Sequence, residues 1–233
     1  MMTLSIVIPI FNEKNTILAL LKKVVEIDLG EIKKEIILID DGSTDGTKEI
    51  LKTLENQYKI IYHEKNQGKG AAVRTGFKNA TGDLILIQDA DLEYDPQNYL
   101  NLMKPILEGR ADVVFGSRFL NPQFKHVSKL SHLANIVLTG FSNLLTGLKL
   151  TDMWTCHKIF KKEVVDAISP KLTGNRFEIE PEMTALIAKK KFRVQEVPLS
   201  VLGIFRTIKE GKKVRMKDGV ISIWYMIKFN LLK

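Results

Sequence analysis

The fold of this chain follows from the stretch Asp83-Leu-Ile-Leu-Ile-Gln-Asp-Ala-Asp-Leu-Glu93, an apolar run that ends in three carboxylates. Residues 84–87 are too few for an amphipathic helix and follow the turn signal Thr81-Gly82, so we predict a strand that is buried on both faces. The carboxylates then lie at the carboxyl end of this strand. Open α/β sheets bind their ligands at that end.

Asp89 and Asp91 are two residues apart, so in an extended segment their side chains point the same way. Two anions held close together are costly unless a cation lies between them. Hard carboxylate oxygens, with room for water and phosphate, suit Mg²⁺ or Mn²⁺. An isolated Asp-x-Asp more often marks two solvated turn aspartates, so the interpretation depends on the rest of the chain.

Strand and helix patterns alternate around this stretch. We predict strands at 4–10, 35–39, 60–63, 84–87 and 112–115, and helices at 15–27, 47–57, 71–80 and 95–107. Asn15 is the expected cap of the first helix. This alternation predicts an α/β fold with a mainly parallel sheet, helices on both faces and right-handed crossovers.

Polar side chains follow several of these strands and should meet at the carboxyl edge of the sheet. They are Glu13, Asp40, Asp41, Asp89, Asp91 and Arg118. The loop Asn66-Gln-Gly-Lys-Gly70 adds glycines that permit close backbone approach and a charge, Lys69, at the start of a helix. Such a set at one edge indicates a functional site.

The second half of the chain has a different pattern. We predict an amphipathic helix or helix pair at 127–148, interrupted at Gly140. Its apolar stripe either packs on the core, the favoured interpretation, or faces a membrane. A strand at 156–160, a helix at 179–190 and a strand at 192–201 follow. Residues 209–217 include five basic residues, and 220–232 is an apolar segment that either packs on the core or lies in a membrane interface. Nothing indicates a linker, so we expect one domain over 1–233.

The composition of the 233 residues, 45% hydrophobic and 27% charged, is that of a globular chain. The net charge of +8 implies an anionic partner. We do not expect nucleic acid, because no basic strand face carries interleaved aromatics. The single cysteine, Cys156, excludes an internal disulfide and fits a reducing compartment. We expect no signal peptide and no membrane-spanning segment.

Taken together, these motifs resemble the family 2 glycosyltransferases of the GT-A fold, in particular the branch similar to dolichol-phosphate mannose synthase and bacterial polyprenyl-phosphate glycosyltransferases. The donor half is matched by Val7-Ile-Pro-Ile-Phe-Asn-Glu13, Asp40-Asp-Gly-Ser-Thr-Asp45, Asn66-Gln-Gly-Lys-Gly70 and Gln88-Asp-Ala-Asp-Leu-Glu93. The acceptor half is matched by Thr151-Asp-Met-Trp-Thr-Cys-His-Lys-Ile-Phe160, Glu180-Pro-Glu182, Glu196-Val-Pro198 and Glu210-Gly-Lys-Lys213.

The resemblance implies roles for individual residues. Asp89 and Asp91, with Glu93 as a third ligand, hold Mg²⁺ or Mn²⁺ on the donor diphosphate. The substrate-binding residues are Pro9, Phe11, Glu13, Asp40, Asp41, Lys69, Asp89 and His132, and the catalytic residues are Asp91, Arg118, Arg206 and Lys212. Trp154, His157 and Ile208 depart from the family pattern, which leaves the sugar open.

The implied reaction moves mannose or glucose from GDP-Man or UDP-Glc to a polyprenyl or dolichyl phosphate. The anionic nucleophile needs no strong base, but it does need fixed positive charge. Direct displacement inverts the anomeric centre. Residues 1–120 bind the nucleotide sugar, and 121–233 bind the acceptor at the cytoplasmic face of a membrane, held by the basic segment and the last helix or by a small transmembrane partner.

Two other functions stay open at this point. A family 2 transferase that sugars a polysaccharide or protein hydroxyl would need a carboxylate base, for which Asp152, Glu180 or Glu182 are available. A transferase-like module that only binds a nucleotide sugar would have no need of the metal-type pair.

Overall fold

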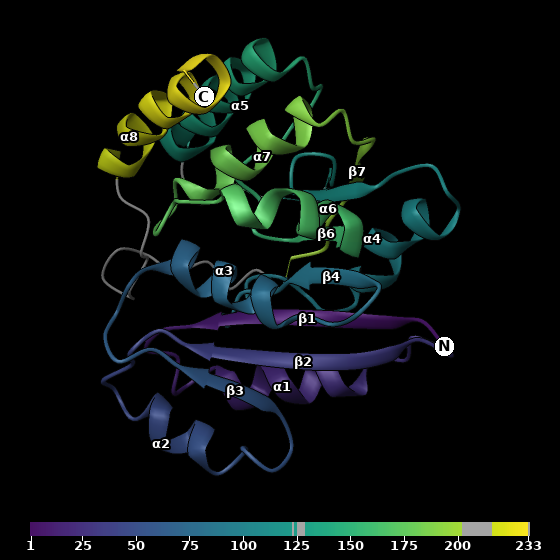
Figure 1. The fold of residues 1–233 in the computed structure, drawn as a ribbon, viewed down its shortest axis with the longest axis vertical. Helices are drawn as coiled ribbons and strands as arrows, with labels where there is room; N and C mark the ends of the chain where they lie inside the picture. Colours follow the sequence, from purple (N-terminus) through teal and green to yellow (C-terminus); the bar gives the residue numbers. More distant parts are fainter. Residues whose placement is uncertain (123, 125–128, 202–215, 233) are drawn as a thin grey trace.

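The computed structural model describes residues 1–122, 124, 129–201 and 216–232. In these residues seven strands form one sheet in the order β3-β2-β1-β4-β6-β5-β7 (Figure 1). The strands are β1 (Thr3–Ile10), β2 (Lys33–Asp40), β3 (Lys59–Tyr62), β4 (Leu84–Ile87), β5 (Val113–Ser117), β6 (Lys158–Lys161) and β7 (Val194–Pro198). Only β6 runs antiparallel to its neighbours, β4 and β5. The predicted mainly parallel α/β sheet is confirmed.

Helices cover both faces of the sheet. They are α1 (Ile17–Glu26), α2 (Thr47–Lys52), α3 (Lys69–Asn79), α4 (Asn98–Leu107), α5 (Lys129–Thr146), α6 (Lys162–Ile168), α7 (Ile179–Lys189) and α8 (Met216–Ile227), with the short 3₁₀ helix η1 (Ser169–Lys171) and the π-helix η3 (Lys228–Leu232). Along β1, Ile6 and Ile8 pack with α1 and α4, whereas Val7 faces α3, α6 and α7. This period-two alternation divides the core into two layers.

Helices α5, α7 and α8 pack on one another at one end of the molecule, seen at the top of Figure 1. α5 is one continuous helix, so the predicted interruption at Gly140 is wrong. The space beside Gly140 is open, and a helix tolerates an isolated glycine at a modest cost. Within the described residues, no helix combines the length and the apolar character that crossing a bilayer requires.

Local boundaries differ from the sequence prediction at several helix ends. Thr16, and not Asn15, is the residue before α1, and its hydroxyl turns back to the Glu13 carboxylate at 2.7 Å. α2 is shorter than predicted, and α3 begins at Lys69, inside the glycine loop. α6 was not predicted, because its seven residues follow β6 without a turn signal.

Close packing of α3 on β1 depends on Gly76. A Cβ at this position would lie 2.1 Å from Cγ1 of Val7, whereas a Cβ at Gly140 meets nothing within 4 Å. We expect Gly76→Ala to lower the free energy of unfolding by about 2 kcal/mol, because β1 and α3 must separate. The matched change Gly140→Ala should raise it by about 0.5 kcal/mol, through better helix propensity. Urea denaturation measures both, and equal effects would contradict this packing.

Candidate active site

The loops after β1 and β2 are tied to each other. Asn12 has a left-handed backbone (φ 56°), and its side-chain oxygen accepts the Thr44 amide at 2.8 Å. Its own amide donates to the Ser43 hydroxyl at 2.9 Å, and the Glu13 amide donates to the Thr47 hydroxyl at 2.8 Å. These bonds fix the path of the chain from Pro9 through the buried Glu13.

The two aspartates at the end of β2 have different surroundings, although both are buried. Asp41 accepts bonds from the His63 ring, the Asn66 side chain and the amides of residues 67 and 68, so both of its oxygens hold the glycine loop in place. Among the described residues, the Asp40 carboxylate accepts the Ser43 amide at Oδ1, and its buried Oδ2 has no hydrogen-bond partner there. The cost of such an orphan acceptor is removed when a ligand brings an N–H or O–H group to it.

Asp89 and Lys69 join the end of β4 to the start of α3. Lys69 Nζ lies 2.6 Å from Asp89 Oδ1. Burial alone would lower the pKa of Lys69, but the Asp89 carboxylate holds that pKa well above its usual value. The ammonium is therefore permanently charged at the place where a phosphate would approach the two acids.

Asp91 lies in a turn at the carboxyl end of the β4 segment. Leu92 has a left-handed backbone (φ 62°), and the Glu93 amide donates to Asp91 Oδ1 at 3.2 Å. Burial, then the Asp89 charge and then the Glu93 charge, raise the pKa of Asp91 to about 7. A left-handed backbone at Leu92, which carries a side chain, costs free energy, and so does the buried acid Asp91 next to two other acids. Such strain and such shifted pKa values are common at functional sites.

Because Asp91 must lose its proton to bind a cation, we expect metal affinity to depend on pH around that value. Below pH 7 a proton competes with the metal for the Asp91 carboxylate, and above pH 7 the ionised carboxylate binds the metal without that competition. The Kd for Mn²⁺ should rise about tenfold per pH unit below 7 and level off above 8, measured by calorimetry on the ligand-free protein. A flat profile between pH 5.5 and 8 would contradict the raised pKa.

Asp89 and Asp91 fit a divalent cation in donor chemistry, and Asp91, whose pKa is raised by burial and by neighbouring acids, would gain a counter-charge from it. Within the described ranges, however, no group of three or more His, Cys, Asp or Glu side chains forms a metal-holding cluster. The role of Glu93 as a third ligand stays a prediction. A cation held here by Asp89 and Asp91 would complete its shell with water and diphosphate oxygens.

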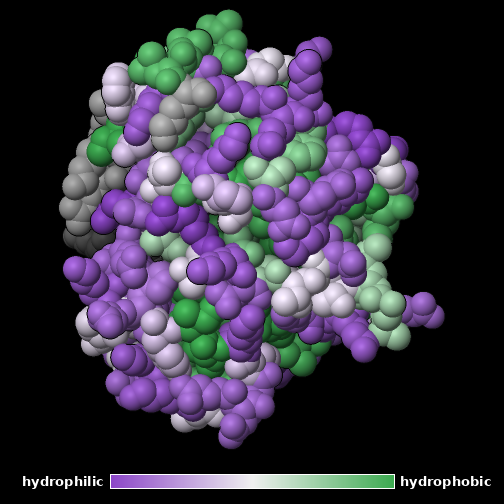
Figure 2. Space-filling view, viewed as in Figure 1, coloured by the Kyte–Doolittle hydropathy of each residue, from purple (hydrophilic) through white to green (hydrophobic). Residues whose placement is uncertain are grey.

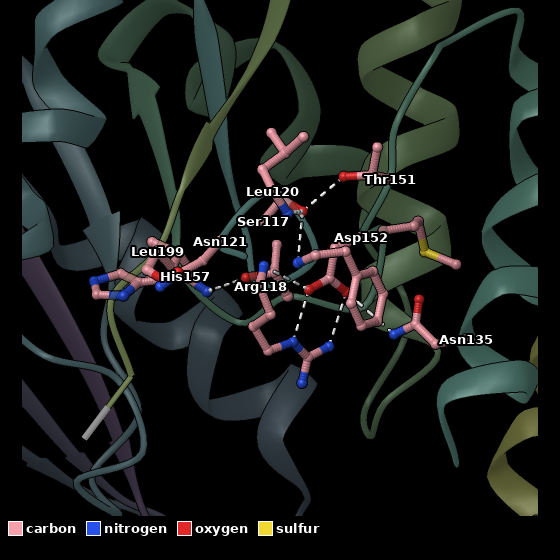
Figure 3. Close-up of polar contacts among 12 residues, drawn as sticks. Ser117, Arg118, Leu120, Asn121, Asn135, Thr151, Asp152, His157 and Leu199 are labelled. Atoms are coloured by element: carbon pink, nitrogen blue, oxygen red, sulfur yellow. Dashed lines mark hydrogen bonds and ion pairs between the residues drawn. The ribbon is translucent and has the colours of Figure 1, made fainter. Parts of the chain in front are cut away.

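Arg118 follows β5 and is held by a buried carboxylate (Figure 3). Its Nε and Nη2 donate to the two oxygens of Asp152 at 2.7 and 2.8 Å, and its backbone amide adds a third bond at 3.2 Å. Burial would lower the pKa of Arg118, but Tyr94 and Asp152 raise it further above its usual value. Asn135 of α5 donates to the same carboxylate at 3.1 Å.

The donor acids and Arg118 belong to one neighbourhood. Burial raises the pKa of the Tyr94 phenol, and that pKa also responds to the charges of Arg118 and Asp89. Burial likewise raises the pKa of the Cys156 thiol, and that pKa also responds to the charges of Asp89 and Lys69. Both side chains therefore sit within electrostatic reach of the donor half and the acceptor half.

The remaining predicted site residues are placed less centrally. Pro9 and Phe11 are half-buried at the end of β1, and the His132 ring packs against Phe119 at 4.8 Å between centroids. Arg206 and Lys212 lie outside the described residues. The roles given to all these residues stay predictions.

Sequence reasoning missed the network that holds Arg118. Asp152 appeared only as a candidate base, and Asn135 and Cys156 had no role. The Glu196 carboxylate of β7, quoted only as part of a motif, accepts the amides of Thr151 and Asp152 at 2.7 and 3.0 Å. The feature that marks Asp152 is its position shortly before β6, a strand that begins at the sheet edge where the parallel strands end.

Comparison with known proteins places this geometry in a family. Glycosyl transferase family 2 matches residues 5–169. The UDP-N-acetylglucosamine–dolichyl-phosphate N-acetylglucosaminyltransferase of Methanococcus voltae is 29% identical, over 96% of this chain and 95% of that protein. The dolichyl-phosphate beta-glucosyltransferase of Saccharomyces cerevisiae is 30% identical, over 84% of this chain and 66% of that protein.

Solved structures agree on the fold. Glucosyl-3-phosphoglycerate synthase of Mycobacterium tuberculosis, in complex with phosphoglyceric acid, superposes with a TM-score of 0.77 at 18% identity, covering 98% of this chain and 80% of that one. The same enzyme with Mn²⁺, UDP-glucose and phosphoglyceric acid gives a TM-score of 0.74. With a family match over most of its length and a GT-A sheet that gathers acids and an arginine at one edge, this chain belongs to glycosyl transferase family 2.

Proposed function

We propose that this protein is an inverting, metal-dependent hexosyltransferase that moves a sugar from a nucleotide sugar to a polyprenyl or dolichyl phosphate. Two relatives of similar sequence carry dolichyl phosphate in their names. The proposal also has support from the site itself, where a held arginine lies near the donor acids.

The observation that carries the proposal is the state of the three acids that could serve a hydroxyl acceptor as base. Glu180 is 2% exposed and paired with Lys158, and Glu182 is fully buried with bonds to Thr173 and the Gly174 amide. Asp152 is fully buried too. Burial would raise its pKa, but the Arg118 charge and bonds lower it overall, so it is a weak base. An acceptor that is already anionic needs none of them.

The donor proposal rests on Asp40. Its orphan Oδ2 suits a base with an N–H on its pairing edge, which uracil and guanine have and cytosine lacks at N3. Because one relative has UDP-N-acetylglucosamine in its name and similar structures hold UDP or UDP-glucose, we place UDP-Glc first, UDP-GlcNAc second and GDP-Man third. None of the relatives and structures named above has mannose in its name, so mannose as the transferred sugar rests on the sequence resemblance alone.

The chain's own groups can assist the transfer in three ways. A divalent cation, when bound, supplies Lewis-acid stabilisation of the diphosphate leaving group. Lys69, held by Asp89, adds fixed charge beside it, and the Arg118 guanidinium orients the acceptor phosphate through directional N–H donors. Direct attack by the phosphate then forms one glycosidic bond as the bond to the diphosphate breaks, with inversion.

Incubation with a panel of nucleotide sugars, Mg²⁺ or Mn²⁺ and a short polyprenyl phosphate tests the function, with mass spectrometry of the organic phase. We expect a hexosyl polyprenyl phosphate whose anomeric coupling shows the β configuration from an α-linked donor. Sugar found only in water-soluble products would favour the hydroxyl transferase. Binding of UDP without turnover of any donor would favour the non-catalytic module.

We also propose peripheral attachment to the cytoplasmic face of a membrane. Apolar side chains gather over α5 and α8, at the top of Figure 2. The exposed ones are Leu133, Ile136, Val137 and Leu144 of α5, Ile221, Ile223 and Trp224 of α8, and Leu231 and Leu232 of η3. The basic segment 209–217 runs into the first residues of α8, a combination that suits anionic lipid. A single cysteine fits the reducing side.

The attachment predicts sedimentation with anionic liposomes and release by salt. Trp224→Ser and Leu144→Ser, at positions 57% and 79% exposed, should each weaken binding about tenfold, because each removes buried apolar area at the lipid surface. The matched control is Leu100→Ser on α4, which is 53% exposed on another element. Binding that is lost equally in the control, or absent at low ionic strength, would leave docking on a transmembrane partner as the explanation.

A further inference from the structure

The buried Asp152 carboxylate is the centre of a chain of contacts that no catalytic role explains. It accepts four bonds, three from Arg118 and one from Asn135. Behind it, Glu196 fixes the backbone of residues 151 and 152, and the Thr139 hydroxyl donates to the Asn135 side chain at 3.0 Å. Strands β5 and β7 and helix α5 thus converge on one carboxylate.

The geometry divides the Arg118 guanidinium into two edges. Asp152 takes the edge formed by Nε and Nη2, so both N–H groups of Nη1 and the second one of Nη2 point away from it. Asp152 is fully buried, whereas the Arg118 side chain is 18% exposed. The outer edge is the arrangement that binds two phosphate oxygens at once.

We infer that Asp152 is a positioning residue for transfer: it fixes the rotamer of Arg118 so that the outer guanidinium edge meets the acceptor phosphate. This inference rests on the proposed function. Because Asp152 neutralises the charge of Arg118, Arg118 orients the acceptor phosphate through its N–H groups. The net electrostatic attraction for the acceptor comes from other cations. Asp152 therefore determines the orientation of the bound acceptor phosphate and does not raise the affinity for it.

Asp152→Asn separates these two contributions. The kcat should fall about 100-fold, the loss expected from misplacing a reacting group by about 1 Å. The KM for polyprenyl phosphate should not rise, since an uncompensated guanidinium attracts the phosphate at least as strongly. A purely structural loss would instead weaken acceptor and UDP binding together.

The decisive measurement is a double-mutant cycle with Arg118→Met. If Asp152 acts through Arg118, then Asp152→Asn has no further effect on kcat in the Arg118→Met background. Independent, multiplying effects would overturn the inference, as would a single variant with wild-type kcat. Should Asp152→Asn fail to fold, Asn135→Ala replaces it in the same cycle, with an expected kcat loss of about tenfold.

Asp112→Asn is the matched control. Asp112 pairs with Arg193 and Lys161 at the opposite end of β5, far along the strand from Arg118. Its loss should lower stability but leave kcat and acceptor KM unchanged. The Arg118 Nε–H signal of the wild-type protein, followed by NMR hydrogen exchange, gives a readout without any turnover. Slow exchange supports the Asp152 clamp, and fast exchange contradicts it even if no sugar is transferred.

Discussion

Asp89→Asn should reduce kcat for sugar transfer about 10³-fold, the scale of losing one main stabiliser of a developing charge. The change removes one of the two carboxylates proposed to hold the divalent cation. It also removes the negative charge that lies 2.6 Å from the Lys69 ammonium. Both changes weaken the stabilisation of the leaving diphosphate. Mn²⁺-dependent UDP binding, measured by calorimetry, should weaken in parallel, while UDP binding without metal changes little.

Asp95→Asn is the control for this variant. Asp95 lies on the same segment, and its Oδ1 accepts the Gln97 amide at 3.2 Å, a bond that asparagine can keep. Transfer should stay within about twofold of wild type, because a conservative change away from the site has a small effect. If Asp89→Asn lost metal binding but kept full transfer, metal dependence would be wrong for this protein.

Breaking the Lys158–Glu180 pair should produce the largest loss of stability. Lys158 of β6 is fully buried, and its ammonium contacts the Glu180 carboxylate, the Thr155 carbonyl and the Phe115 ring. Glu180→Leu leaves a buried ammonium without its counter-ion. We expect the free energy of unfolding to fall by about 3–5 kcal/mol in urea denaturation.

Replacing both partners tests the cause of that loss. The double variant Lys158→Met with Glu180→Leu buries no charge, so it should be more stable than Glu180→Leu alone. As a surface comparison, Asp166→Asn breaks the exposed Lys162–Asp166 pair and should change stability by less than about 1 kcal/mol. A double variant that is less stable than the single one would show that packing, and not charge, dominates at this position.

The sequence pattern predicted the strands and their polar ends well, because a buried parallel strand leaves a clear apolar run with a turn after it. It predicted less about the second half. Gly140 suggested an interruption of α5, but the open space around it lets the helix continue. The antiparallel direction of β6 has no local signal, since it depends on which strands accept its hydrogen bonds.

The candidate site was predicted as a set of residue types, but not as a set of contacts. Asp40 and Asp41 are adjacent and chemically identical, yet the glycine loop and His63 occupy both oxygens of Asp41, whereas Oδ2 of Asp40 has no hydrogen-bond partner among the described residues. Asp152 is a second example. Its carboxylate suggested a general base, but it is fully buried and paired with Arg118, an arrangement that suits a residue that holds Arg118 in place. These distinctions arise from three-dimensional partners that spacing alone does not reveal.

The reversed direction of β6 has a consequence for how specificity can change. Lys158 pairs with Ile87 at the end of β4 and with Phe115 of β5. The segment 151–157 therefore reaches the carboxyl edge of the parallel strands before its own strand begins, whereas the donor loops reach that edge after theirs end. Under the proposed function, we therefore expect separate stretches of chain to recognise the nucleotide and the acceptor. Grafting residues 151–157 from a relative should retarget the acceptor and leave the choice of nucleotide intact.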